Sequence, residues 1–229
     1  MVVFFGSLIT FGIILKIGLL ITNIEPTEAY KHEKFKQIMN VIIKVFSRMM
    51  LFACGIFWIN KKSIKIDPKK YPKLKIINKK SKIICANHTS FVDIIILGYL
   101  TDISFIGKKA AADYPIVGDI AKTFDCLFIE RSSSSDRYKN ILALQERAKN
   151  IKDGVKYNNL IIFAEGTTSN GKGIAEFKKG AFILDSPLQP NGFKYDGKFH
   201  PGFTLLETIP LLIAIMANFY TSATYFTTE

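Results

Sequence analysis

Short apolar runs alternate with polar junctions and longer helical stretches between residues 82 and 190. Short runs rich in Ile, Leu and Phe predict buried strands, and longer stretches with capping and stop residues at their ends predict helices. We expect strands at 82–86, 103–107, 125–129, 159–164 and 187–190, and helices at 91–100, 108–113, 116–123 and 136–152. Because strands and helices alternate, this pattern predicts an α/β fold with a mostly parallel central sheet flanked by helices.

Two apolar segments precede this alternating region. Residues 1–22 are apolar apart from Lys16, and about 20 such residues span the core of a bilayer. They lack the basic start and the small-residue cleavage site of a signal peptide, so we expect an uncleaved membrane helix. Residues 41–59 are interrupted by Lys44 and Arg48, one helical turn apart, which is typical of an interfacial helix or of the returning arm of a hairpin. The alternative is an ordinary amphipathic helix packed on the domain.

The charge of the chain indicates an anionic partner. The net charge is +12, and lysines crowd between residues 61 and 82. An anionic membrane surface and nucleic acid are the two candidates. Because the cluster directly follows an apolar segment and has few aromatic neighbours, it favours lipid headgroups, and we expect no nucleic acid partner. A solvated lysine-rich linker is the alternative.

These features predict four parts. We expect an N-terminal membrane helical hairpin at 1–60, a basic linker at 61–81, an α/β domain at 82–202 and an apolar C-terminal segment at 203–229. In the last part, residues 203–219 are apolar apart from Glu207 and contain Pro210. They predict a helix at or in the membrane interface, with a buried core helix as the alternative.

The cysteines and the remaining histidines give no sign of a metal. Cys54, Cys85 and Cys126 are scattered and odd in number, which fits neither a disulfide framework nor a zinc site. They indicate a reducing compartment and buried apolar thiols. His32 and His200 have no ligand-like neighbours, so we expect no metal.

The first polar junction joins the first strand to the helix that follows it. Five positions along a helix turn a side chain by about 500°, so His88 and Asp93 cannot share a helical face. They can meet only if the chain turns between them, and Asn87, Thr89 and Ser90 favour such a turn. Asp93 would then hold one ring nitrogen of His88 and leave the other for a substrate proton. The alternative is a helix cap without a catalytic function.

A second polar junction, Glu165-Gly166-Thr167, directly follows another buried strand, and Arg131 follows a third. Ligands of α/β sheets bind beyond the carboxyl ends of the strands. Because three polar sets follow three such strands, we expect them to form one catalytic site. Taken alone, the second junction is also compatible with an ordinary turn, and it lacks the Gly-Lys-Ser/Thr pattern of a P-loop.

Four motifs resemble those of the glycerolipid acyltransferases in their order and approximate spacing. They are Asn87-His88-Thr89-Ser90-Phe91-Val92-Asp93, Phe128-Ile129-Glu130-Arg131, Phe163-Ala164-Glu165-Gly166-Thr167-Thr168 and Pro187-Leu188-Gln189-Pro190. The stretches Thr167-Thr168-Ser169-Asn170-Gly171 and Phe177-Lys178-Lys179-Gly180-Ala181-Phe182 resemble the branch that acts on lysophosphatidylcholine and lysophosphatidylethanolamine. The resemblance covers residues 82–190.

The resemblance implies a membrane-bound enzyme that moves a fatty acyl group from acyl-CoA to a hydroxyl of a lysophospholipid or of lysophosphatidic acid. It implies that His88 is the general base and that Asp93 orients it. The residues implied in substrate binding are Arg131, Glu165, Gly166 and Thr167 at the acceptor phosphate and Pro190 near the acyl donor. Apart from the resemblance, we expect Asn87 to contribute to substrate binding, with the backbone amides of its turn stabilising the tetrahedral oxyanion. Acyl-CoA is then a co-substrate, and no cofactor is expected.

The chain departs from the family pattern at two positions. Ala164 stands where the family usually has proline, and Thr168 stands where many members have arginine. The second change removes a phosphate contact and leaves the acceptor class open. We expect a membrane location, with the endoplasmic reticulum favoured over the mitochondrial inner membrane. The alternative function is a structural subunit of a membrane protein complex that keeps this fold and binds phospholipid without turnover.

Overall fold

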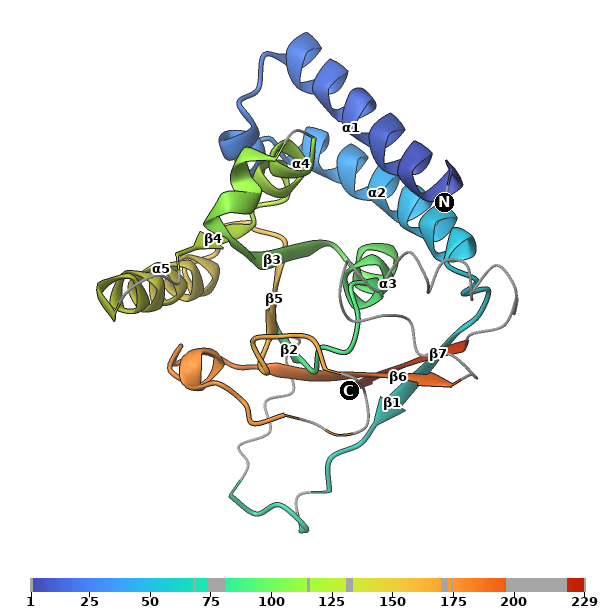
Figure 1. The fold of residues 1–229 in the computed structure, drawn as a ribbon. Helices are drawn as coiled ribbons and strands as arrows, with labels where there is room; N and C mark the ends of the chain where they lie inside the picture. The colour runs from blue at the N-terminus through green and yellow to red at the C-terminus, as the bar shows by residue number, and fades with distance from the viewer. Residues whose placement is uncertain are drawn as a thin grey trace.

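Figure 1 shows a computed structural model of the chain, which describes residues 2–67, 69–73, 81–114, 116–130, 134–169, 173, 175–196 and 222–228. The described residues form the predicted α/β fold around a sheet with the strand order β1-β7-β6-β2-β5-β3-β4. The strands are β1 (Ile59–Ile64), β2 (Ile83–Ala86), β3 (Ile103–Lys108), β4 (Leu127–Ile129), β5 (Asn159–Phe163), β6 (Gln189–Asp196) and β7 (Ser222–Thr228). Strands β2 to β6 run parallel, and β7 runs antiparallel to β6, so the mostly parallel sheet is confirmed.

Helices cover both faces of this sheet (Figure 1). The described helices are α1 (Val2–Thr22), α2 (Glu33–Ala53), α3 (Val92–Leu100), α4 (Val117–Thr123) and α5 (Ser134–Lys152), with short 3-10 turns η1 (Pro26–Lys31), η2 (Lys109–Asp113) and η3 (Lys179–Ala181). The helices predicted at 91–100, 116–123 and 136–152 are confirmed as α3, α4 and α5. The short helix predicted at 108–113 is the 3-10 turn η2.

The alternation of side chains along β2 produces the layers. Ile84 and Ala86 face α3 and the end of α2, while Ile83 and Cys85 face α5. A strand places successive side chains on opposite faces, so a strand buried on both faces is apolar throughout. This explains why the run before His88 contains no polar side chain. The central strand is thereby fixed in place, and its carboxyl end delivers the polar junction to one edge of the sheet.

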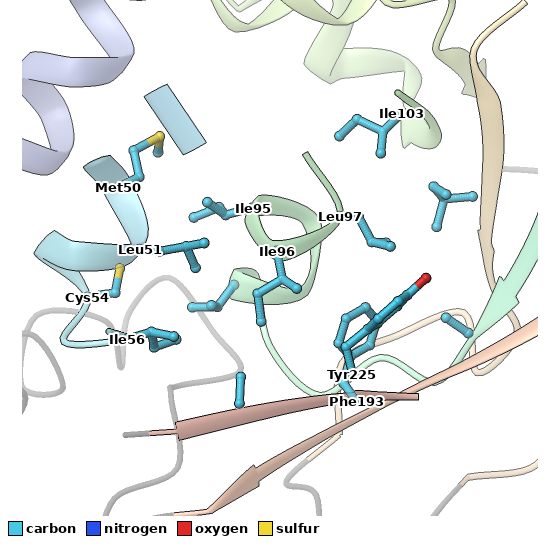
Figure 2. Close-up of a cluster of buried hydrophobic side chains, with 14 of the residues drawn as sticks. Met50, Leu51, Cys54, Ile56, Ile95, Ile96, Leu97, Ile103, Phe193 and Tyr225 are labelled. Carbon is cyan, nitrogen blue, oxygen red and sulfur yellow. The ribbon is translucent and has the colours of Figure 1, made fainter. Parts of the chain in front are cut away.

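Figure 2 shows the layer on the α3 side of the sheet. Ile96 of α3 lies between Leu51, near the end of α2, and the rings of Phe193 and Tyr225 on β6 and β7. Ile96 and Leu51 are both fully buried. Burying one such side chain contributes about 1.5–3 kcal/mol, so this layer holds α3, and with it the turn before α3, firmly against the sheet.

One edge of the sheet differs from the sequence-based prediction. β1 uses residues assigned to the hairpin and the basic linker, and β7 comes from the C-terminal segment. β7 is an inner strand that buries Ala223 and Tyr225, whereas β1 is an exposed edge strand that carries Lys61 and Lys62. Edge lysines discourage further strand pairing, so part of the lysine cluster has a structural explanation. β6 is longer than the strand predicted at 187–190.

Two other sequence-based predictions about domains remain as they were. The helix predicted at 203–219 lies outside the described residues. The predicted boundary of the α/β domain at 82–202 stays a prediction.

At the N-terminus, α1 and α2 lie side by side as a helical hairpin (Figure 1). Within the ranges given above, no helix is both long enough and apolar enough to cross a membrane. The predicted membrane helical hairpin is therefore not supported. α1 instead buries Phe11, Leu15 and Leu19, one helical turn apart, against α2, η1 and α4. The inner face of the hairpin thus fits the alternative interpretation of residues 41–59, which was an amphipathic helix packed on the domain.

The charges that interrupt the two apolar segments turn toward the domain. Lys16 pairs with Asp119 of α4 at 3.1 Å, and Lys44 pairs with Asp102 at 2.7 Å. Arg48 donates a hydrogen bond of 2.6 Å to a backbone carbonyl beyond α2. The large exposed apolar side chains of the hairpin, here called the apolar stripe, are Ile9, Ile13, Ile14, Ile17, Leu20 and Ile21 on α1 and Ile38, Val41, Val45, Met49 and Phe52 on α2. A helix that faces water normally has the opposite arrangement.

Candidate active site

His88 and Asp93 are in contact beyond the carboxyl end of β2, as the predicted turn requires. His88 Nδ1 lies 2.9 Å from Asp93 Oδ2. The turn is closed by its own polar groups, since the Ser90 hydroxyl accepts a hydrogen bond from the backbone N–H of Val92 at 3.1 Å. α3 begins at Val92, so Asp93 sits in its first turn, where the helix dipole favours a negative charge. The catalytic roles of His88 and Asp93 stay predictions.

The carboxylate of Asp93 is fully buried and surrounded by donors. Oδ2 also accepts the backbone N–H groups of Thr89 at 2.7 Å and Ser90 at 2.9 Å. Oδ1 accepts the Thr89 hydroxyl at 3.3 Å and the Tyr195 phenol at 2.5 Å. A buried charge is tolerated only when it is paired and hydrogen-bonded, and this set meets that condition. Because an ionised carboxylate only accepts, Nδ1 of His88 is the donor in this contact, which places the lone pair of the neutral imidazole on Nε2.

The second polar junction holds His88 from the other side. Glu165 is 1% exposed; its Oε1 accepts the backbone N–H of His88 at 2.8 Å, and its Oε2 accepts the N–H of Ala175 at 3.0 Å. The carbonyl of His88 accepts the N–H of Ser169 at 2.8 Å. The His88 ring stacks on Phe163 at 3.9 Å between centroids, with 15° between the planes. The loop after β5 therefore fixes the backbone of the histidine, and Phe163 at the end of β5 fixes its ring plane.

Gly166 allows this loop to turn back. Its φ is +71°, a conformation that a side chain disfavours, and an added Cβ would lie 3.4 Å from Lys178 Cγ. The backbone N–H of Lys178 donates to the carbonyl of Ala164 at 2.7 Å, which holds the returning chain beside the loop. Thr167 is exposed. Gly166 and Thr167 thus lie at the open side of the loop, while Glu165 points inward.

Asn87 and Pro190 lie at the junction of β2 and β6. The Asn87 amide accepts the N–H of Phe193 at 2.8 Å and donates to its carbonyl at 3.1 Å. This side chain therefore continues the pairing of β2 with β6 by one step. Pro190 is paired with Cys85 in the register of these strands. The substrate-binding roles assigned to Asn87 and Pro190 stay predictions, and Arg131 lies outside the described residues.

Sequence reasoning missed Tyr195. It stands on β6, 102 positions after Asp93, beyond the last motif, and no local pattern connects the two. Burial, followed by the charge of Asp93, raises the pKa of the Tyr195 phenol well above its usual value of 10.0. The phenol therefore remains a hydrogen-bond donor across the physiological pH range. The only sequence signal is the period of two that puts Phe193 and Tyr195 on one face of the strand.

In the part of the chain that the structure describes, no group of three or more His, Cys, Asp or Glu side chains is placed to hold a metal ion. The three cysteines are free and buried, as the sequence predicts. Burial raises the pKa of Cys54 and that of Cys126 to about 12. Such thiols stay protonated and are poor nucleophiles.

Comparisons with known proteins identify the family of the chain. The Acyltransferase family profile matches residues 66–194. The chain is 28% identical over 167 residues to the lysophospholipid acyltransferase LPEAT1 of Arabidopsis thaliana, covering 66% of this chain and 42% of that protein. It is 28% identical over 164 residues to lysophosphatidylcholine acyltransferase 1 of Homo sapiens, covering 72% of this chain and 28% of that protein.

A solved structure shows the same fold. The 1-acyl-sn-glycerophosphate (LPA) acyltransferase PlsC from Thermotoga maritima aligns with a TM-score of 0.56 and 18% sequence identity, over 97% of this chain and 83% of that chain. At that identity the likeness concerns the fold alone. The chain spans less than half the length of the two relatives above, so their activities are not transferred to it as a whole. The family profile covers more than half of the chain, and the chain belongs to the acyltransferase family.

Proposed function

We propose that this protein transfers a fatty acyl group from acyl-CoA to the free hydroxyl of a lysophospholipid, lysophosphatidic acid included. The observation that carries the proposal is the contact between His88 Nδ1 and Asp93 Oδ2 at 2.9 Å, beyond the carboxyl end of a central strand. The family assignment and the names of the related acyltransferases support the reaction class and the acceptor class.

The proposed reaction is a direct transfer. Nε2 of His88 removes the proton of the acceptor hydroxyl while its oxygen attacks the thioester carbonyl carbon, which gives a tetrahedral intermediate. The carbon–sulfur bond then breaks, the ester remains, and the imidazolium returns the proton to the leaving thiolate of CoA. Asp93 keeps the ring oriented and stabilises its positive charge. A positioned general base of this kind contributes about 10²- to 10⁴-fold.

The acceptor phosphate is proposed to lie near Gly166, Thr167 and Arg131. Gly166 and Thr167 form the open side of the loop after β5, and Arg131 follows β4, whose carboxyl end lies at the same edge of the sheet. Glu165 contributes indirectly in this proposal, because both of its oxygens accept backbone hydrogen bonds. Pro190 and Asn87 are proposed to border the acyl donor at the β2–β6 junction.

The apolar stripe of the hairpin is proposed to lie in the interface of a bilayer. Val41 and Val45 are 61% and 56% exposed, and their neighbours on the stripe are apolar as well. The charges of the two segments contact the domain, so a lipid surface can meet the stripe without burying a charge. Such a position gives the site access to lipid substrates. The choice between endoplasmic reticulum and mitochondrial inner membrane stays a prediction.

Replacing apolar side chains of the stripe with charged ones tests the membrane contact. The double variant Val41→Asp/Val45→Asp should lose binding to phosphatidylcholine–phosphatidylserine vesicles in flotation, because it places two carboxylates in the apolar layer. Leu142→Asp on α5, which changes another exposed aliphatic side chain, is the matched control and should bind as wild type. Equal binding of all three proteins would contradict the proposed contact.

The activity is tested by acyl-CoA consumption in detergent and in liposomes with a panel of lysophospholipids and lysophosphatidic acid. Wild type should turn over, His88→Ala should abolish turnover, and Asp93→Asn should reduce it by about 10⁴-fold, the effect of a wrongly oriented base in a comparable triad. The preferred acceptor names the headgroup. Wild type without turnover on any acceptor, together with bound phospholipid, would instead favour the structural subunit of a membrane complex.

A further inference from the structure

We infer that Tyr195 is a positioning residue of the active site, whose phenol acts on His88 through Asp93. The inference rests on the proposed function and adds to it a residue that lies beyond all four sequence motifs. The phenol donates to Asp93 Oδ1 at 2.5 Å, while His88 Nδ1 meets Oδ2 of the same carboxylate at 2.9 Å.

The two oxygens of Asp93 have separate partners. Oδ2 is held by the backbone of Thr89 and Ser90, which belong to the same turn. Oδ1 is held by the Thr89 hydroxyl at 3.3 Å and by Tyr195 from β6, a distant part of the chain. The shorter of the two contacts to Oδ1 is therefore the one from the sheet. Tyr195 fixes the rotation of the carboxylate, and so it fixes which way the oxygen that faces His88 points.

β6 supports this turn at a second point. The backbone of Phe193 binds the side chain of Asn87, the residue just before His88. Phe193 and Tyr195 lie on the same face of the strand, two positions apart. The strand thus positions the turn through the contact of Phe193 with Asn87, and it orients the Asp93 carboxylate through Tyr195. A shift of β6 would be transmitted to the histidine ring.

The phenol also changes the charge that His88 experiences. A donor on Oδ1 draws negative charge away from Oδ2, so that the carboxylate stabilises an imidazolium less strongly than it would alone. Among the described residues, the other titratable group that acts on the phenol is Cys54, beyond the end of α2. Removing the phenolic hydroxyl should therefore weaken the orientation of His88 and favour its protonated form.

Tyr195→Phe removes the hydroxyl and little else. We expect kcat to fall about tenfold, the effect of losing one hydrogen bond to a charged group, with KM for both substrates within about twofold of wild type. The acidic limb of the kcat/KM profile should move to higher pH by several tenths of a unit. Thr89→Val, which removes the weaker donor of the same oxygen, should give a smaller change in the same direction.

Tyr225→Phe is the matched control. Tyr225 stands on β7 in register with Phe193, lies in the same buried layer, and has a hydroxyl that accepts a hydrogen bond from Asn191 at 2.5 Å. The substitution removes the same group from the same layer without touching Asp93. Its kcat and pH profile should match those of wild type. A similar loss of kcat in both variants would mean that the layer, and not the Asp93 contact, limits activity.

A double-mutant cycle separates positioning from general stability. If Tyr195 acts through Asp93, Asp93→Asn/Tyr195→Phe should be as slow as Asp93→Asn alone. Additive losses, or a Tyr195→Phe enzyme with the kcat and pH limb of wild type, would overturn the inference.

A second measurement needs no turnover, so it keeps this inference separate from the proposed function. The chain has three histidines, and NMR of labelled imidazole groups can follow His88 after assignment with His88→Ala. Tyr195→Phe should move the His88 titration to higher pH, and Tyr225→Phe should leave it in place. An unmoved titration in Tyr195→Phe would overturn the inference even for an inactive protein.

Discussion

Glu165→Gln decides whether this carboxylate holds the active site together or binds the substrate. The family resemblance places Glu165 at the acceptor phosphate. The structure instead places its two oxygens on the backbone N–H groups of His88 at 2.8 Å and Ala175 at 3.0 Å, in a side chain that is 1% exposed. A carboxylate close to a phosphate would also repel it. These contacts, here called the clamp, favour a role of Glu165 in holding the backbone of His88 over a contact with the phosphate.

The size of the effect follows from these two bonds. Glutamine has one acceptor oxygen, and its NH2 group would face a backbone N–H, so one of the two bonds must be lost. A hydrogen bond to a charged group contributes about 1.5–3 kcal/mol. A neutral side chain is less costly to bury, which offsets part of that loss. We expect the free energy of unfolding to fall by about 2 kcal/mol, and kcat to fall at least about tenfold because the backbone of His88 is released.

Chemical denaturation in detergent, together with steady-state kinetics, measures both effects. Glu176→Gln is the control, since Glu176 is an exposed side chain next to Ala175 and undergoes the same chemical change; it should keep the stability and kcat of wild type. The clamp predicts that KM for the acceptor stays within about twofold. A Glu165→Gln enzyme with wild-type stability and a strongly raised acceptor KM would refute the clamp and favour direct substrate contact.

Two further predictions concern buried groups away from the site. The raised pKa values of Cys54 and Cys126, about 12 against an ordinary 9.0, mean that the unfolded chain loses these protons first as pH rises. Stability should thus fall between pH 9 and 12, by up to about 1.4 kcal/mol per pH unit for each thiol. Cys54→Ala/Cys126→Ala should flatten the curve of unfolding free energy against pH, and an unchanged slope would contradict the assignment. Lys36→Met leaves the Asp125 carboxylate, 3.1 Å from the ammonium, without its ion-pair partner, at a cost of about 3–5 kcal/mol. Denaturant unfolding should show this loss and show none for the exposed Lys34→Met on the same helix; equal stability of the two variants would disprove it.

Two features of the site were predicted from sequence: the turn made by neighbouring residues, and the meeting of the His88 and Glu165 junctions at one edge of the sheet. The turn between His88 and Asp93 follows from the spacing of five and from the turn-forming residues within it. The strand before it follows from a continuous apolar run. Tyr195 could not be found this way, because its contact with Asp93 depends on how β6 pairs with β2. That pairing is determined by the whole sheet and leaves no local signal.

The edge strand β1 could not be predicted from the sequence for a related reason. Its lysines match a basic linker as well as they match an edge strand, because only one face of an edge strand needs apolar residues and the pairing with β7 is made by backbone groups. β7 is separated from its partner β6 by residues 197–221, so the sequence has no short hairpin signal that would predict their pairing. Sequence periodicity therefore predicted β2 to β6 and missed β1 and β7.

The hairpin shows how one sequence pattern can support two structures. Charges within an apolar segment usually mark the side of a helix that faces water, and on that reading Lys44 and Arg48 would point outward. Here Lys44 contacts Asp102 and Arg48 contacts the backbone carbonyl of Phe57, just beyond α2, while the exposed face carries the apolar stripe. Hydrophobic periodicity is the same for either orientation, since it reports that two faces differ and not which one faces the protein. The polar partners decide the orientation, and those of Lys16 and Lys44, Asp119 and Asp102, come from segments distant in sequence. A stripe turned outward in this way has no reason to persist in water, which is why vesicle binding by the Val41→Asp/Val45→Asp protein is the measurement on which the interfacial placement depends.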